Sequence, residues 1–326
     1  MPPRLIAIDL DGTLLNSSGH VSPRNLVALK LAESFGIEVV ISTGRRHSFA
    51  MRVLRDLNLR HTSAVVSSNG TVVRTIGSEL IHCTHLPLST ARWLCSHLND
   101  YRNTLVLTFD LTGPDGDDSR GALIVQHLDE LHSSIGRWMR ANQPYIQHVT
   151  RIEDALQPGA NPPIQMMLCG PIDRMRQAEA LLSQHPLVTP VGEHETPQAE
   201  ALLNQHPLVT PVGDPESPQA EVALHRTTYP ETDLTLLDIL PAGCSKASAL
   251  EHLAKLRGIT SADILAIGDN WNDVAMLRLA GHAALMSNAP DDLKALASAS
   301  GWIVVPSNDE DGVAVAIESV LSQVPV

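Results

Sequence analysis

The chain has 326 residues, and 23 lysines and arginines against 36 aspartates and glutamates give it a formal net charge of −13 at pH 7. At roughly 150 residues per domain, this length predicts about two domains. Hydrophobic residues make up 43% of the chain, a composition typical of a globular protein and not of a disordered chain or a membrane protein. So negative a chain repels nucleic-acid backbones and anionic lipid, and no lysine- or arginine-rich run offsets this. We therefore expect neither nucleic acid nor a membrane as a partner.

The cysteines and the apolar runs bear on the cellular compartment. Cys83, Cys95, Cys169 and Cys244 lie far apart without a CxxC pair, which predicts neither a zinc site nor a disulfide framework. No apolar stretch approaches the roughly 18 residues of a transmembrane helix, and the run at 5–8 is too short for a signal peptide. We expect a cytoplasmic protein.

Short apolar runs alternate with helical patterns along the first 80 residues. Ser22 is a predicted N-cap, and Gly36 marks the end of the helix that follows it. The βαβαβ order predicts a parallel sheet with helices on its faces. The expected elements are a strand at 5–8, a helix at 23–35, a strand at 37–41, a helix at 46–57 and a strand at 64–67.

The same alternation returns at the other end of the chain, so both ends are expected to complete one sheet. Helices are predicted at 246–256, 273–280, 291–298 and 313–321, and strands at 264–267, 283–286 and 302–305. The pattern between them predicts an inserted α+β domain. It has strands at 104–109, 123–126, 164–168, 221–227 and 234–239, and helices at 90–98 and 173–183. The expected domains are a discontinuous core of residues 1–84 and 242–326 and an insertion of residues 85–241.

A tandem repeat lies inside the insertion. Residues 178–198 and 199–219 differ at four of their 21 positions. Stacked repeat arrays need about three copies, so a local duplication is the simpler interpretation. We expect one copy to be structural, the other to form an extra helix or a proline-rich excursion, and neither to carry chemistry; His185 and His206 within them receive no role.

Two carboxylates follow the first predicted strand. Asp9 and Asp11 are two residues apart, so both point to one side of the carboxyl end of the sheet, where open α/β folds bind ligands. Gly12 lets the backbone turn and present an N–H to an anion. A polar exit from a strand explains the same pattern, whereas an EF-hand is unlike it because Leu14 follows where further acids are needed.

Polar residues also follow two other strands. Residues 42–45 (STGR) are typical of a helix N-cap, but Thr43 would lie beside Asp9 if the first two strands are neighbours. Residues 268–273 (GDNWND) are explained by a turn with a helix N-cap, but two carboxylates, Asp269 and Asp273, and an asparagine beside Asp9 and Asp11 would also supply the oxygen ligands of a hard cation. Lys246, alone, is typical of a solvated surface, yet beside such a pocket it can neutralise a phosphate.

These four motifs, DLDGT at 9–13, STGR at 42–45, Lys246 and GDNWND at 268–273, resemble the ordered motifs of the haloacid dehalogenase (HAD) superfamily. The α+β insertion between the second and third motifs resembles the Cof-type subfamily (HAD-IIB) with its C2B cap. The resemblance implies an α/β fold, in which a HAD-like Rossmannoid parallel-sheet core carries an inserted α+β C2B cap domain. It covers the core motif by motif and the cap by position alone.

The resemblance also implies a role for each matched residue. Asp9 would be the nucleophile that forms an aspartyl-phosphate, and Asp11 would protonate the leaving oxygen and then deprotonate water. Thr43 and Lys246 would hold the phosphoryl oxygens. The implied substrate-binding residues are Leu10, Gly12, Gly44, Arg45, Asn69 and Asn272, with the backbone after Asp9 and at Gly44 contributing. The implied Mg²⁺ ligands are Asp9, Asp11 through its carbonyl, and Asp269, with Asp273 completing or supporting the set together with Asn272.

Three further segments leave alternatives open. The loop of residues 68–70 often faces the substrate in such enzymes, but Asn69-Gly70 is equally a hairpin signal. Arg45, Arg46 and His47 can reach a substrate anion or simply face solvent. The acidic run at 113–118 is expected to be a hairpin tip because its residues favour turns.

The expected function is a Mg²⁺-dependent phosphatase acting on a small phosphorylated metabolite, such as a sugar phosphate or a phosphorylated cofactor. The expected assembly is a monomer or homodimer. A phosphomutase of the phosphomannomutase type is the alternative with the same nucleophile chemistry, and a non-catalytic sensor of phosphorylated metabolites is a third.

Overall fold

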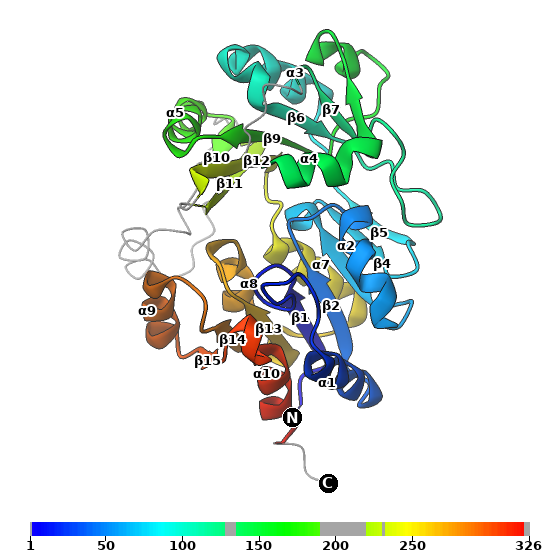
Figure 1. Cartoon of the computed structure of the whole chain (residues 1–326), viewed down its shortest axis with the longest axis vertical. Helices are drawn as coiled ribbons and strands as arrows, with labels where there is room; N and C mark the ends of the chain where they lie inside the picture. Colours follow the sequence, from blue (N-terminus) through cyan, green and yellow to red (C-terminus); the bar gives the residue numbers. More distant parts are fainter. Residues whose placement is uncertain (1, 128–134, 190–219, 230–231, 323–326) are drawn as a thin grey trace. The chain divides into compact units, whose positions relative to one another are not determined.

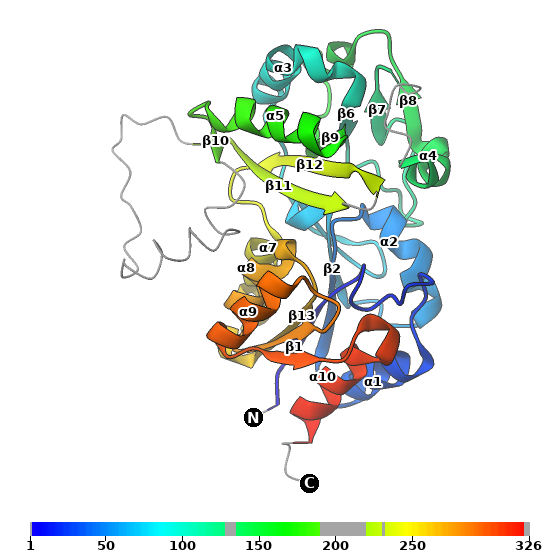
Figure 2. The same cartoon turned by 60° about the vertical axis from the view of Figure 1, so that its left-hand side comes forward.

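The computed structural model describes residues 2–127, 135–189, 220–229 and 232–322. Contacts divide the chain into two units, and Figures 1 and 2 show the elements of each. The first unit comprises Met1–Cys83, Pro114–Asp117 and Ser245–Val326, and the second comprises Thr84–Gly113 and Asp118–Cys244. The first unit thus includes a short segment, Pro114–Asp117, that lies within the expected insertion.

An eight-stranded sheet forms the centre of the first unit, in the order β15-β14-β13-β1-β2-β3-β4-β5. The six strands from β15 to β3 are parallel, which confirms the expected parallel core. β4 and β5 extend it antiparallel and were not predicted. The strands are β1 (Leu5–Asp9), β2 (Glu38–Ser42), β3 (Ala64–Ser67), β4 (Val72–Thr75), β5 (Leu80–Cys83), β13 (Ile264–Gly268), β14 (His282–Met286) and β15 (Ile303–Val305).

Helices and single turns connect these strands. Ser22 caps the first helix as expected, since its side chain accepts a hydrogen bond from the Asn25 N–H. The helix expected at 46–57 is an α-helix only to Leu54 and ends in a 3-10 turn. The helices are α1 (Pro23–Ser34), α2 (His47–Leu54), α7 (Lys246–Arg257), α8 (Val274–Leu279), α9 (Asp291–Ser300) and α10 (Gly312–Leu321), and the 3-10 turns are η1 (Arg55–Leu57), η2 (Ser68–Gly70), η9 (Ser261–Asp263), η10 (Trp271–Asp273) and η11 (Asn308–Glu310).

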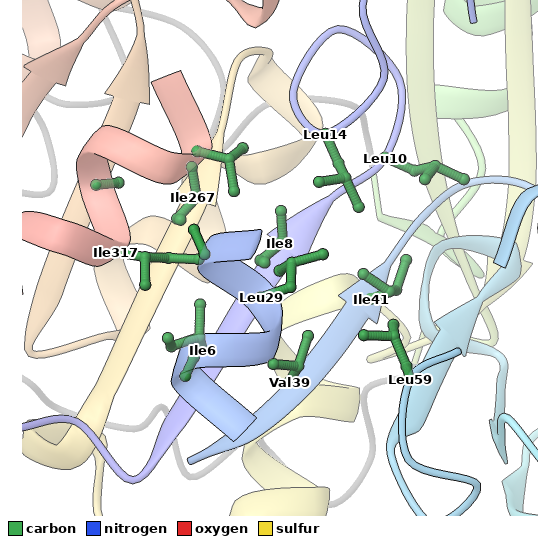
Figure 3. Close-up of a cluster of buried hydrophobic side chains, with 14 of the residues drawn as sticks. Ile6, Ile8, Leu10, Leu14, Leu29, Val39, Ile41, Leu59, Ile267 and Ile317 are labelled. Carbon is green, nitrogen blue, oxygen red and sulfur yellow. The ribbon is translucent and has the colours of Figure 1, made fainter. Parts of the chain in front are cut away.

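The first strand is buried on both faces of its sheet. Ile6 and Ile8 belong to an apolar cluster with Leu29 of α1 and Ile317 of α10, and Figure 3 shows these side chains close together. Leu5 and Ala7 belong to a second cluster, which includes residues of α7, α8 and α9. Because successive strand side chains point to opposite faces, a central parallel strand is apolar throughout. This burial anchors β1, so the polar residues that follow it start from a rigid base.

The second unit is an α+β fold, as expected for the insertion. Its seven-stranded, mainly antiparallel sheet has the order β10-β11-β12-β9-β6-β7-β8. The strands are β6 (Leu105–Thr108), β7 (Leu123–Val125), β8 (Ile146–His148), β9 (Gln165–Gly170), β10 (Val188–Thr189), β11 (Val222–Tyr229) and β12 (Leu234–Pro241). The helices are α3 (Leu88–His97), α4 (Gly136–Asn142) and α5 (Ile172–Ser183), with 3-10 turns η3 (Asn99–Thr104), η6 (Gln143–Tyr145) and η7 (Ile152–Leu156).

Part of the tandem repeat belongs to this unit. The first copy, which starts at residue 178, supplies the end of α5 and the strand β10 up to residue 189. The rest of that copy and the whole second copy, with His206, lie outside the described residues. His185 packs against Trp93, with their ring centroids 4.2 Å apart.

The cysteines and the apolar character of the helices bear on two further expectations from the sequence. Cys83, Cys95, Cys169 and Cys244 are free thiols, and all but Cys83 are buried. Among the helices that the structure describes, none combines the length and the apolar character that a membrane span requires.

Candidate active site

The strand register brings three motifs to one edge of the sheet. Asp9 pairs with Ser42 on β2, so Thr43 follows one position further along. On the other side Ile8 pairs with Ile267, which places Gly268 and Asp269 at the same edge. The expectation that Thr43 lies beside Asp9 because their strands are neighbours is therefore confirmed.

Lys246 contacts two carboxylates of the site, those of Asp9 and Asp273. Its side chain is 1% exposed, and its Nζ lies 2.5 Å from Asp9 Oδ1 and 2.7 Å from Asp273 Oδ1. The residue opens α7, whose start is fixed by a capping box between Ser245 and Ser248. A lysine at a rigid helix start thus donates to both acids, and the interpretation of Lys246 as a solvated surface residue is wrong.

Asp273 holds this arrangement together. Its Oδ1 accepts from Lys246, and its Oδ2 accepts from the backbone N–H groups of Asp269 (3.1 Å) and Asn270 (3.2 Å). Both oxygens are therefore committed to fixing α7 and the turn after β13. Gly268 is needed here because a Cβ at that position would approach Asp273 Oδ2 to 2.7 Å.

Asp269 is fixed from the first motif. Thr13 Oγ1 donates to Asp269 Oδ1 at 2.8 Å, and a Cβ on Gly12 would lie only 2.4 Å from Asp269 Oδ2. Gly12 also has φ +80°, a conformation that glycine adopts without steric cost. The turn after β1 and the turn after β13 are consequently in direct contact, and Thr13 is a site residue to which sequence reasoning assigned no role.

Burial and mutual repulsion perturb these ionisable groups. Burial, followed by the charge of Asp273, raises the pKa of Asp9 well above its usual range. Burial and the charge of Asp273 likewise raise the pKa of Asp269 to about 7. Burial alone would lower the pKa of Lys246, but the charges of Asp273 and Asp9 outweigh it and raise that pKa. The ammonium is therefore charged at neutral pH, and the carboxylates lack a full complement of positive charge.

The donor set fits a divalent cation. Asp9, Asp269 and Asp273 each offer an oxygen, and these oxygens lie within 4.8 Å of one another. When all three carboxylates are ionised, a single ammonium leaves two negative charges uncompensated, and hard cations such as Mg²⁺ bind carboxylate oxygen. Because both oxygens of Asp273 are engaged, Asp9 and Asp269 are the better placed ligands, and Asp273 supports them.

Asp11 lies apart from this buried cluster. Its side chain is 56% exposed and forms an ion pair with Arg45, whose Nε and Nη2 lie 2.7 and 2.5 Å from the two carboxylate oxygens. The Arg45 guanidinium also lies 5.0 Å from the centre of the Phe49 ring. Two expected site residues, Asp11 and Arg45, are thus brought together at the exposed rim.

The loop at residues 68–70 is a hairpin turn, which is one of the two alternatives that the sequence offered. Ser67 pairs with Val72, so the loop is the turn of an antiparallel hairpin. The Asn69 N–H donates to the Thr43 carbonyl at 3.1 Å, and a Cβ on Gly44 would lie 3.1 Å from Asn69 Oδ1. Ser68 and Asn69 both have positive φ. The hairpin turn therefore packs against the second motif.

The remaining candidates are placed as follows. Arg46 and His47 are 8% and 3% exposed, so the interpretation that they face solvent is wrong; they pack at the start of α2. The side chain of Leu10 is fully buried in the core, which leaves its backbone as the part able to meet an anion. Asn272 is half-buried in η10.

The acidic run at 113–118 forms a turn, as expected. Thr112 and Asp118 make an isolated antiparallel bridge. Arg55 donates to the Asp115 carbonyl at 2.8 Å and pairs with Asp117 at 3.1 Å. These contacts attach Pro114–Asp117 to the first unit.

Comparisons with known proteins show the family to which the chain belongs. Residues 6–185 and 219–317 match the family model described as haloacid dehalogenase-like hydrolase. The chain is 30% identical to 5-amino-6-(5-phospho-D-ribitylamino)uracil phosphatase YwtE of Bacillus subtilis, over 98% of each chain. It is 26% identical to an HMP-PP phosphatase of Serratia proteamaculans, over 90% of this chain and 87% of the relative.

A solved structure extends the match to the fold. A haloacid dehalogenase-like hydrolase from B. subtilis superposes with a TM-score of 0.69 at 25% identity, covering 97% of this chain and 99% of the other. The family model spans most of both units and includes all four motifs. On this evidence the chain belongs to the haloacid dehalogenase-like hydrolases, as a Cof-type phosphatase of that superfamily.

Proposed function

We propose that this chain is a Mg²⁺-dependent phosphatase that hydrolyses small phosphorylated metabolites through an aspartyl-phosphate on Asp9. The observation that carries the proposal is the buried Asp9–Lys246–Asp273 chain of contacts, with Asp269 beside it. The proposed substrates are sugar phosphates and phosphorylated cofactors or their precursors. Two relatives support this class of substrate, because their names describe them as phosphatases of 5-amino-6-(5-phospho-D-ribitylamino)uracil and of HMP-PP.

Asp9 is suited to attack phosphorus. One of its oxygens is held by Lys246, which fixes the orientation of the carboxylate and leaves the second oxygen to form the new bond. Attack of that oxygen forms a P–O bond to Asp9 and breaks the bond between phosphorus and the leaving oxygen. Holding the nucleophile in one orientation removes rotational freedom before the reaction, which lowers the barrier.

Asp11 is suited to move the proton. In the first step it gives a proton to the leaving oxygen, and in the second it takes one from the water that attacks the aspartyl-phosphate. The products are an alcohol and inorganic phosphate, and Asp9 is regenerated. The Asp11 side chain is 56% exposed, which gives its carboxylate access to a leaving group and to water.

Positive charge has to balance the incoming phosphate. Lys246 supplies one charge inside the site, and Thr43, Arg45 and the backbone N–H groups of Gly12 and Gly44 line the same sheet edge. Asp9 and Asp269 would hold Mg²⁺, with the Asp11 carbonyl as a further ligand and Asp273 and Asn272 as support. When bound, Mg²⁺ neutralises the carboxylates and the transferring phosphoryl group.

A phosphate-release screen tests this function. Purified protein is incubated with 5-amino-6-(5-phospho-D-ribitylamino)uracil, HMP-PP and a set of sugar phosphates, with Mg²⁺ and with EDTA, and inorganic phosphate is measured. We expect release with Mg²⁺ and its loss in EDTA. Asp9→Asn keeps the size of the side chain but removes the nucleophile, and it should lower kcat by about 10⁴-fold or more.

Two outcomes would contradict the proposal. Turnover that survives Asp9→Asn would rule out Asp9 as nucleophile. Conversion of a sugar phosphate into an isomer with little free phosphate would identify a phosphomutase instead of a phosphatase.

A further inference from the structure

The turn that carries Asp11, at residues 10–15, is contacted by two other segments of the chain. On its inner side, Gly12 packs against Asp269 and Thr13 donates to the same carboxylate. On its outer side, Asn288 Nδ2 donates to the Gly12 carbonyl at 2.9 Å. The Gly12–Thr13 peptide, one position beyond Asp11, therefore lies between the turn after β13 and a residue that follows β14.

Asn288 is itself held rigidly. Its Oδ1 accepts from the Asn308 N–H at 3.1 Å, so its amide group is oriented with the nitrogen toward Gly12. Its neighbours on both sides are fixed by backbone bonds, Ser287 N–H to the Val305 carbonyl (2.9 Å) and Ala289 N–H to the Met286 carbonyl (3.1 Å). A donor with a defined direction thus reaches the active-site turn from the ends of β14 and β15.

Asn308, the hydrogen-bond partner of Asn288, also binds the turn at residues 10–15. Asn308 Nδ2 donates to the Leu15 carbonyl at 2.8 Å, and the Leu15 N–H donates to the Leu10 carbonyl at 2.8 Å. The residues on either side of Asp11 are consequently tied to one pair of asparagines. The two asparagines and the turn are far apart in sequence, since Asn288 follows Gly12 by 276 positions.

This grip matters because of what lies inside it. Gly12 has φ +80° and, as a glycine, no side chain that could hold its backbone in place. The orientation of the Gly12 backbone decides where the adjacent N–H groups and Asp11 point. A small displacement of such a turn misaligns the proton donor, and geometry errors of about 1 Å at a reacting group can cost 10²-fold in rate.

We propose that Asn288 is a positioning residue, which fixes the Gly12 peptide and thereby the orientation of Asp11 during phosphoryl transfer. The proposal rests on the proposed phosphatase function. Asn288 acts through the turn, so its loss should lower kcat and leave KM nearly unchanged.

Two substitutions at this exposed position separate its two hydrogen bonds. Asn288→Ala removes both, whereas Asn288→Asp keeps the acceptor for Asn308 and removes the donor to Gly12. We expect both variants to lower kcat about tenfold, with KM for the phosphate ester changed less than about twofold. Asp309→Ala is the control, because Asp309 is next to Asn308 in sequence but accepts a hydrogen bond from the Ser17 N–H, beyond the turn at residues 10–15. The kcat of this variant should stay within about twofold of the wild-type value.

A second measurement is independent of turnover. Hydrogen exchange of the amides at 10–15, followed by peptide mass spectrometry, should be about tenfold faster in both Asn288 variants and unchanged in Asp309→Ala. Wild-type kcat in Asn288→Asp would overturn the proposal, and so would unchanged exchange at 10–15. If the wild-type chain released no phosphate from any ester, the proposed function would fail, and the exchange rates would still decide whether Asn288 holds the turn.

Discussion

At the scale of single residues, the main feature of the site is that three buried carboxylates face a single ammonium group. Asp9 and Asp273 share one ammonium, and Asp269 adds a third carboxylate within 4.8 Å. Removing a partner from a buried ion pair leaves a charge that neither water nor protein compensates. Lys246 therefore stabilises the fold as well as serving the proposed chemistry.

Replacing Lys246 by Met tests this balance. The variant should lose about 3–5 kcal/mol of unfolding free energy without metal, because two buried carboxylates lose their counter-charge. Mg²⁺ should raise its unfolding midpoint more than that of the wild type, since the site is then more negative. Urea unfolding with EDTA or Mg²⁺ measures both effects.

The matched control lies on the same helix. Lys255 is exposed and pairs with Glu251 at 2.9 Å, so Lys255→Met should cost less than about 1 kcal/mol. Equal losses for the two variants would show that the buried contacts of Lys246 are not what stabilises the fold.

Two glycines with nearly the same backbone conformation separate strain from contact. Gly12 and Gly19 have φ +80° and +78°, but a Cβ at Gly19 would meet nothing within 4 Å. Both alanine variants should lose roughly 1 kcal/mol of stability from the left-handed backbone. Gly12→Ala alone should also lower kcat by about 100-fold, because its methyl group displaces Asp269. Similar kcat values for both variants would contradict the contact seen at Gly12.

At the scale of elements, β2 begins with a half-buried acid, Glu38. Glu38 pairs with Arg257 at 3.5 Å, and its Oε1 is buried with no hydrogen-bond partner among the described residues. Burial outweighs the attraction of Arg257 and raises the pKa of Glu38 above its ordinary value. The folded state then binds the proton more tightly than the unfolded state, so stability from this group falls as pH rises through the folded pKa.

Glu38→Gln should remove that pH dependence. The variant should be more stable than the wild type at pH 7, by less than about 1 kcal/mol because the carboxyl is partly exposed. The difference should vanish below about pH 4, where the carboxyl is protonated in both states. Urea midpoints at the two pH values measure it, and a variant that is less stable at pH 7 would show that the Arg257 pair outweighs burial.

Element types were predicted well where one pattern dominates. The inner parallel strands β13, β1, β2 and β3 have apolar runs that are almost completely buried, as β1 illustrates with Ile6 and Leu5 in different clusters. The edge strand β15 is apolar in sequence but partly exposed at Ile303 and Val304. β4 and β5 were missed because the turn at Ser68–Gly70 reverses the chain and adds them antiparallel. A connection of this length cannot make the crossover that a parallel strand needs, and no apolar periodicity announces that reversal.

At the scale of the whole molecule, most of the tandem duplication lies outside the match to the family model. The family model matches 6–185 and 219–317 and leaves out the residues between. The first copy supplies the end of α5 and β10 from residues 178–189.

Deleting residues 199–219 tests the role of the second copy, because it removes one copy and joins Gln198 to Ala220. We expect kcat/KM within about twofold of the full chain and a change in stability below about 1 kcal/mol, since loop length affects closure entropy only weakly. Phosphate release and thermal unfolding measure the two quantities. A loss of folding, or a large change in KM, would show that the second copy is part of the cap's structure or of its substrate recognition.

The sequence by itself determined the element types of the core, the order of the four motifs and the identity of the acids. These follow from local rules: apolar runs form buried strands, and polar residues after parallel strands meet at one edge. The tertiary structure decided which groups touch. Lys246 reaches Asp9 across 237 positions and Asn288 reaches Gly12 across 276, because strand register and helix packing bring them within hydrogen-bond distance. Hydrogen bonds require placement to a few tenths of an ångström, and no periodicity in a sequence specifies distance so finely.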